Sequence, residues 1–200
     1  VTFATGAIYT FDSLNLPLAW NRVILNSGAS LAISGNLSVD VSGVSLNGGT
    51  LTTGGLLVHD SPNWAGSIND GKQTIEQGDS IINGSTLIAS RSNSSFITRA
   101  VSSEYDWAVA NNLWLGNDGA IIDSNGHDIG ITMTLGNFSG QSGSLTKTGA
   151  GTLTLSTNNG YAGGTTVNGG ILEIAGSSAG NSYIRGIVTV NSGAELRYTG

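Results

Sequence analysis

The sequence predicts an all-β solenoid, in which short strands joined by glycine turns stack coil upon coil. Apolar residues alternate with Thr, Ser and Asn over many short stretches, which is the period-two pattern of half-buried strands. Glycine accounts for 31 of the 200 residues and proline for only 2, so the turns depend on the backbone freedom of glycine. Since none of these strands is long enough to build a core alone, each coil must bury its apolar face against the next.

Composition and charge exclude several functional classes. Charged residues make up only 10% of the chain and hydrophobic residues 38%, a balance typical of an ordered chain. The net charge of −6 and the scattered Lys and Arg residues leave no basic stripe for nucleic acid. The absence of cysteine excludes disulfides, a thiol nucleophile and a cysteine-ligated zinc site. The chain has no apolar run of about 18 residues that could cross a membrane as a helix.

Residues 1–58 predict short strands that follow one another at regular intervals. Pro17 marks an irregular corner in the first coil. Residues 24–44 and 45–58 alternate cleanly between apolar and polar side chains, and each range predicts a pair of strands. Residues 59–64, HDSPNW, follow as the first loop.

One apolar marker in each coil gives the number of coils. Most successive markers lie 17 to 20 residues apart, whereas 34 residues separate Leu87 from Ile121. Counting that gap as two turns, we expect about nine to ten coils, and at about 4.8 Å for each coil a rod of roughly 45 Å. The markers are Leu31, Leu51, Ile68, Leu87, Ile121, Leu135, Leu153, Leu172 and Leu196.

Residues 91–114 interrupt the pattern and predict a loop insertion. They include four charged residues and two of the four tryptophans of the chain. Ser103 followed by Asp106 resembles a helix-capping pair ahead of Trp107, which suggests one short helix in the insertion.

The most regular stretch, residues 144–176, predicts two or three very short strands between glycine turns. Its pattern is Leu-x-Lys-x-Gly-x-Gly-x-Leu-x-Leu, then Asn-x-Tyr-x-Gly-x-Thr-x-Val, then Gly-x-Leu. This pattern resembles the passenger-associated repeat of bacterial autotransporters, with departures beside turns at Gly160 and Ile171. The matching residues are Leu145, Lys147, Gly149, Gly151, Leu153, Leu155, Asn159, Tyr161, Gly163, Thr165, Val167, Gly170 and Leu172.

The resemblance implies a right-handed parallel β-helix that is secreted and displayed outside a Gram-negative-type cell. It implies no enzymatic activity, and no cofactor is expected. Neither end of the chain offers a cap, so we expect residues 1–200 to be a single segment of a longer solenoid. Its function would be that of a non-catalytic structural or adhesive segment of an autotransporter-like protein or extracellular fibre. Its partners would be flanking repeats, like copies stacked head to tail, or cell-surface glycans.

Two kinds of short polar motif resemble a calcium site or a hydrolytic triad, but both favour simpler interpretations. Residues 123–128 superficially resemble a calcium loop, but Thr134 stands where an EF-hand needs glutamate, which favours an Asn-Gly turn. The histidine-containing stretches 59–61 and 127–128 lack the strained nucleophile turn of a hydrolytic triad. Four Asn-x-Ser sequons, which matter only if the host glycosylates them, begin at Asn36, Asn83, Asn93 and Asn137.

A polysaccharide-cleaving or carbohydrate-binding β-helix is the alternative function. Cleavage needs two or three acids held about 5–9 Å apart, and Asp118 and Asp123 could meet this need on neighbouring coils. Thirteen acidic residues are sparse for a catalytic groove and suit solubility of the rod. Trp64 and Trp107, both in irregular segments, could instead form a sugar-binding platform, although indole rings also cap cores. A second group of acids comprises Asp70, Glu76 and Asp79.

Overall fold

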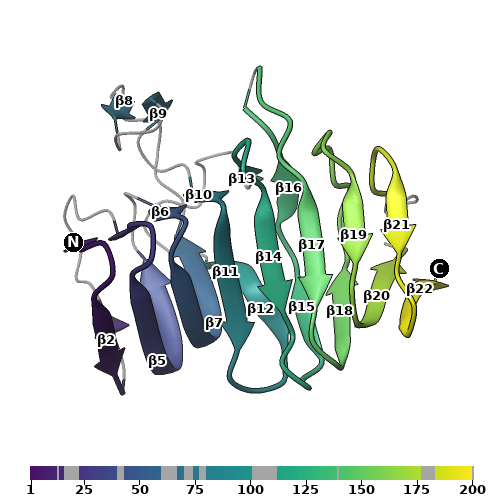
Figure 1. The fold of residues 1–200 in the computed structure, drawn as a ribbon, viewed down its shortest axis with the longest axis horizontal. Coiled ribbons are helices and arrows are strands. Elements are labelled where there is room, and N and C mark those ends of the chain that lie inside the picture. The colour runs from purple at the N-terminus through teal and green to yellow at the C-terminus, as the bar shows by residue number, and fades with distance from the viewer. Residues whose placement is uncertain are drawn as a thin grey trace.

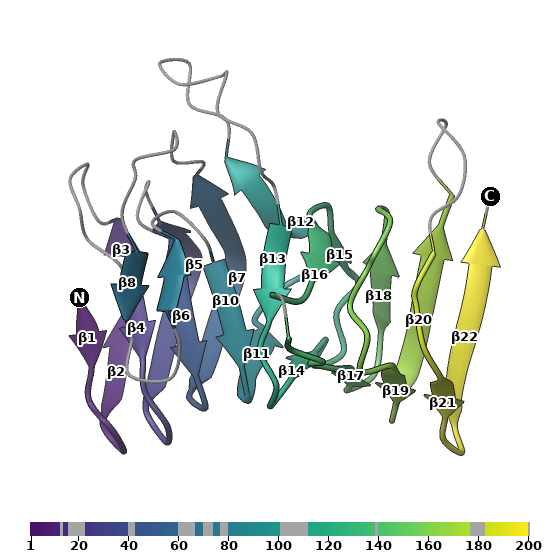
Figure 2. The same ribbon diagram turned by 90° about the horizontal axis from the view of Figure 1, so that it is seen from above.

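The computed structural model describes residues 1–12, 14–15, 23–39, 43–59, 67–69, 74–76, 80–100, 112–138, 140–176 and 183–199. Every regular element in these residues is a β-strand, and all but one strand pair are parallel. The strands stand side by side from the N-terminal to the C-terminal end (Figure 1), and the view from above shows the same order (Figure 2). The fold is therefore the parallel β-helix that the sequence predicts. Within the described residues, no helix is long and apolar enough to cross a membrane.

The first face of the β-helix is a six-stranded parallel sheet. Its strands are short, and each one pairs with the equivalent strand of the next coil. In order they are β1 (Thr2–Phe3), β4 (Val23–Leu25), β6 (Val44–Asn47), β10 (Ser80–Asn83), β13 (Asn112–Leu115) and β16 (Thr134–Gly136).

The second and third faces form one 14-stranded sheet because two long strands bend around the corner between them. These strands are β5 (Ser30–Val39) and β7 (Thr50–His59), and their register shifts between Ile33 and Asn36. The second face continues with β2 (Ile8–Phe11), β11 (Ser85–Ala89), β14 (Ala120–Asp123), β17 (Leu145–Thr148), β19 (Thr165–Val167) and β21 (Val188–Val190). The third face continues with β3 (Leu14–Asn15), β12 (Asn93–Ala100), β15 (Ile129–Ile131), β18 (Thr152–Leu155), β20 (Gly170–Ala175) and β22 (Ala194–Thr199).

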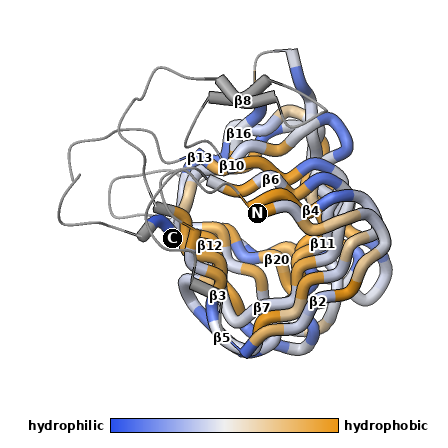
Figure 3. The backbone as a smooth tube through the Cα atoms, turned by 90° about the vertical axis from the view of Figure 1, so that its left-hand side faces the viewer, coloured by the Kyte–Doolittle hydropathy of each residue, from blue (hydrophilic) through white to orange (hydrophobic). Residues whose placement is uncertain are grey.

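The core consists of inward side chains stacked in register from coil to coil. On the second face, Leu51, Leu87 and Ile122 occupy equivalent positions and are buried. Leu155 and Ile174 do the same on the third face. Each such aliphatic side chain contributes about 1.5–3 kcal/mol when it leaves water. The view along the rod shows the coils superposed as a ring in which hydrophobic stretches, in orange, recur among paler and hydrophilic ones (Figure 3).

The described strands stack in eight levels, as the second face shows: β2, β5, β7, β11, β14, β17, β19 and β21. The expected nine to ten coils are too many for two reasons. Ile68 lies in β8 (Ser67–Asn69), which pairs antiparallel with β9 (Thr74–Glu76) outside the three faces. The gap from Leu87 to the next coil is a single level, because β11 pairs directly with β14.

Two further sequence expectations are corrected by the register. Ile121 is not the inward residue of its coil, because it pairs with Thr86 and Thr146 while Ile122 points into the core. Two adjacent isoleucines leave the period-two phase ambiguous, which explains the error. Leu135 is buried, but it lies on the first face rather than beneath Leu153 on the third.

Part of the range 91–114, where the sequence predicts a loop insertion, forms strands of the β-helix. Residues Asn93–Ala100 form β12, which pairs with β7 and β15 as part of the third face. Residues Asn112–Leu115 form β13 on the first face. Residues 101–111, including the suggested helix start, lie outside the described residues.

Candidate functional site

The repeat at residues 144–176 directs its defining side chains into the core. Leu145, Leu153, Leu155, Val167 and Leu172 are all completely buried. The adjacent Thr146, Thr154 and Thr166 are partly exposed. Within the strands, the alternating positions of the motif therefore specify the stacking of coils rather than a surface that could bind a ligand.

The glycines of the repeat make close corners between coils. Gly149 has a φ of 73°, in the left-handed region, and a Cβ at this position would collide with Asp123 Oδ1 and with Asn125 N of the preceding coil. That preceding coil contains its own turn, in which Asn125 has a φ of 51° and His127 N donates to Ser124 O at 2.8 Å. The Asn-Gly turn expected at residues 123–128 is thus confirmed, and Gly149 packs directly on it.

Lys147 is the most unusual residue of the repeat because its side chain is completely buried. It occupies the ladder position between Ile122 and Val167, where the neighbouring coils carry aliphatic side chains. Its ammonium donates to three carbonyl oxygens, those of Thr148 at 2.8 Å, Gly149 at 2.8 Å and Gly169 at 3.0 Å, which matches its three N–H donors. We call Lys147 and these three carbonyls the lysine corner.

The lysine corner joins two coils and perturbs the lysine itself. Thr148 ends β17 and Gly149 follows it, whereas Gly169 precedes β20 in the next coil, so one ammonium connects both turns. Burial lowers the pKa of Lys147 to about 8, and the charge of Asp123 opposes this shift. The three carbonyls stabilise the ammonium form, because only a donor can satisfy them.

Asn159 and Tyr161 continue the first face after its last strand, β16. Asn159 Oδ1 accepts from Leu135 N at 2.9 Å, and Gly160 N donates to Leu135 O at 2.8 Å. Tyr161 is completely buried and its hydroxyl lies 2.6 Å from Thr165 Oγ1. Burial raises the pKa of Tyr161 to about 12, although the hydrogen bond with Thr165 acts in the opposite direction. Asn159 and Tyr161 therefore close the core on the first face at a level where no strand is present in the described residues.

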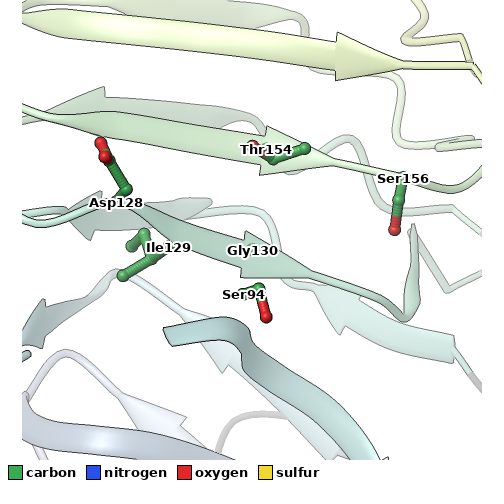
Figure 4. Close-up of a pocket in the computed structure, with 6 residues that line it drawn as sticks. All are labelled: Ser94, Asp128, Ile129, Gly130, Thr154 and Ser156. Carbon is green, nitrogen blue, oxygen red and sulfur yellow. The ribbon is translucent and has the colours of Figure 1, made fainter. Parts of the chain in front are cut away.

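A shallow depression of about 180 Å³ lies on the outer surface of the third face (Figure 4). Gly130 forms its floor, because a Cβ there would meet the carbonyl oxygen of Ser94. Asp128 is the charged residue of its lining, and Asp128 Oδ1 accepts from Thr152 N at 2.8 Å. Hydrogen bonds from the Thr152 backbone and side chain lower the pKa of Asp128. The depression is smaller than the roughly 300–1,000 Å³ of ordinary ligand sites. Its lining is Ser94, Asp128, Ile129, Gly130, Thr154 and Ser156.

The other sequence candidates are not brought together in the described residues. Trp64 and Trp107 lie outside these residues, as do Asp70 and Asp79. Asp123 Oδ1 accepts from Asn125 N at 2.8 Å, so this carboxylate organises its own turn. No cluster of three or more His, Asp or Glu side chains that could hold a metal ion occurs in the described part of the chain.

The sequon asparagines use their amide groups within the fold. Each amide bonds to a residue distant in sequence, so these side chains stabilise contacts between coils. The bonds join Asn36 to Arg91, Asn83 to the amide of Asp118, Asn93 to Gly54 O and Asn137 to Leu115 O.

Sequence reasoning assigned Lys147 to the repeat but gave it no role. The available signal was a single cation at an inward position of an otherwise apolar alternation, followed two and four residues later by glycine. The sequence pattern also gave no indication of a stacked aromatic pair on the first face, where Trp114 and Phe138 have ring centroids 4.6 Å apart.

Comparison with known families supports the repeat directly. Residues 145–174 match the family model described as passenger-associated-transport-repeat. The match supports the resemblance of this stretch to an autotransporter passenger repeat, and such a repeat is typical of a secreted or surface-displayed protein. Comparison with curated proteins gave no match, and comparison with solved structures gave none either.

Proposed function

We propose that this chain is a structural segment of an autotransporter passenger, a stiff rod that holds exposed loops away from the bacterial surface without catalysing a reaction. Adhesion to cell-surface or matrix glycans through those loops is part of the proposal. Flanking solenoid repeats are its proposed neighbours at the end coils, where Ile8 and Ile187 are 80% and 81% exposed.

The observation that carries the proposal is that the residues of the repeat motif hold the coils together. Its apolar positions stack in the core, its glycines make corners, and Lys147 connects two coils. A motif whose residues serve the stacking of coils supports a mechanical role, because a catalytic motif would leave reactive groups facing a cleft.

Surface display tests the proposal. The chain is placed between a secretion signal and an outer-membrane carrier, and an N-terminal tag is probed on intact cells with antibody and with added protease. We expect the tag outside the cell and a protease-resistant fragment that spans the β-helix. Leu153→Asp, which buries an unpaired carboxylate, should remove the resistant fragment. Thr146→Asp, at a partly exposed position, is the matched control and should retain it. A tag that stays inside the cell for the unaltered chain contradicts the proposal.

A carbohydrate-active β-helix remains the second candidate, supported by the depression around Asp128. Reducing-end release from a panel of acidic and neutral polysaccharides distinguishes the two functions. The structural proposal predicts no release above background. Turnover that Asp128→Asn abolishes would favour the second candidate, since that change removes the charged group of the depression while preserving its shape.

A further inference from the structure

The five Asn-Gly pairs of the chain form a set of potential modification sites with different local environments. In such a pair the glycine nitrogen can attack the asparagine side-chain carbon, because glycine offers no side chain to obstruct the approach. The attack needs a glycine N–H that is free of other bonds. The pairs begin at Asn47, Asn83, Asn125, Asn159 and Asn168.

Four of these pairs are held by the fold. The nitrogen of the glycine donates a hydrogen bond in each case, so the attacking atom is engaged. Asn47, Asn83 and Asn159 are also buried, and Asn125 Nδ2 donates to Ala89 O at 3.0 Å. The four bonds run from Gly48 N to Ser85 Oγ, from Gly84 N to Gly119 O, from Gly126 N to Ala150 O and from Gly160 N to Leu135 O.

The fifth pair, Asn168–Gly169, is different. The side chain of Asn168 is exposed, and in the described part of the chain Gly169 N has no hydrogen-bond acceptor. Asn168 Oδ1 accepts from Asn191 Nδ2 at 2.6 Å, which leaves the departing group, Asn168 Nδ2, without such a restraint and polarises the carbonyl that is attacked.

We propose that Asn168 is a site of spontaneous deamidation in the folded protein. Gly169 N forms a bond to Asn168 Cγ, the Cγ–Nδ2 bond breaks, and ammonia leaves with the proton of Gly169 N–H transferred through water. Water then opens the five-membered succinimide at either carbonyl, which gives aspartate or isoaspartate at position 168.

The isoaspartate product acts on the lysine corner. It adds one methylene group to the main chain immediately before Gly169, whose carbonyl oxygen accepts from Lys147 Nζ at 3.0 Å. The aspartate product adds a charge but leaves the backbone path unchanged. Only the isoaspartate form therefore displaces an acceptor of the buried ammonium. Contact between these two coils then weakens slowly as isoaspartate accumulates at the exposed turn.

Peptide mapping by mass spectrometry tests the proposal. The folded protein is incubated at mildly alkaline pH, and isoaspartate is detected with a protein isoaspartate methyltransferase. We expect conversion at residue 168 to be at least about tenfold faster than at the other four pairs, each of which must first break a hydrogen bond. In urea, where the fold no longer protects them, all five pairs should react at similar rates. An equal rate at all five in the folded protein, or faster conversion at Asn125, would overturn the proposal.

Two variants separate the chemistry from its consequence. Gly169→Ala should lower conversion at residue 168 to the level of the protected pairs, and its Cβ would make only an ordinary 3.5 Å contact with Gly149 O. Asn168→Asp reproduces the added charge without the extra methylene. We expect Asn168→Asp to melt like the unmodified protein and the isoaspartate fraction to melt at lower temperature. If residue 168 of Gly169→Ala deamidated as fast as in the unaltered protein, attack by Gly169 N would be refuted. If the aspartate and isoaspartate forms melted at the same temperature, the effect on Lys147 would be refuted.

Discussion

Replacing Lys147 by Met provides the most direct test of the lysine corner. Methionine retains the unbranched apolar stem but has no ammonium, so the carbonyls of Gly149 and Gly169 lose their donor. The carbonyl of Thr148 loses one donor and still accepts from Ser124 N at 3.1 Å. Leaving a buried carbonyl without a donor typically costs about 1–3 kcal/mol for each group. Avoiding the burial of the charge offsets part of this loss, so we expect the variant to be less stable by about 2–4 kcal/mol at pH 7.

The pH dependence gives this prediction a specific sign. The pKa of Lys147 is lowered from 10.5 to about 8 in the folded chain. Below pH 8 the lysine is protonated in both states and adds no slope. Between about pH 8 and 10.5 the folded chain releases its proton first, so the unfolded chain binds more protons and stability rises with pH. The full rise is about 3 kcal/mol at about 1.4 kcal/mol for each pKa unit.

Urea unfolding at several pH values between 7 and 9.5 measures both effects. The difference in unfolding free energy between the wild type and Lys147→Met should grow as pH increases, while other titrating groups cancel between the two proteins. Parallel pH curves, together with equal stability at pH 7, would show that the ammonium is not buried among the three carbonyls.

Three further predictions concern the same coils. Gly149→Ala should destabilise the fold by about 2–4 kcal/mol through its positive φ and its contacts with the preceding turn, whereas Gly160→Ala, which has open space, should be nearly neutral in urea unfolding. Leu153→Asp should cost several kcal/mol, and a melting temperature within a degree or two of wild type would disprove the inward orientation. Tyr161→Phe should cost about 1 kcal/mol near neutral pH. Because the folded pKa of Tyr161 is about 12 rather than 10.0, wild-type stability should fall between pH 10 and 12, and calorimetry should find a smaller fall in this variant.

The fold could be predicted because its causes are local. Alternation of apolar and Thr or Ser residues requires short strands, and repeated glycines require corners, so a stacked solenoid follows from the sequence. Residues 93–100 escaped prediction because the β12 register is irregular between Asn93 and Ile97, and Phe96 and Ile97 are both buried although adjacent. A break in alternation of this kind makes a strand resemble a loop in sequence.

The lysine corner could not be derived from the sequence for a different reason. All three acceptors of Lys147 are backbone carbonyls, which every residue carries, and one of them belongs to the next coil. Residue types therefore give no sign of these bonds, and only the register that places Val167 beside Lys147 brings Gly169 within reach.

The parallel ladders also determine how the rod responds to force. Its backbone hydrogen bonds join one level to the next, so they run roughly along the line between the two chain ends (Figure 1). A pull on those ends loads the levels in series, and the weakest level yields first. The ammonium of Lys147 joins two adjacent levels, because it bonds to the turn after β17 and to the turn before β20. These bonds add to the backbone ladder that holds the two levels together. Extension of single molecules should therefore release coils one at a time, with the level held by Lys147 among the last to part.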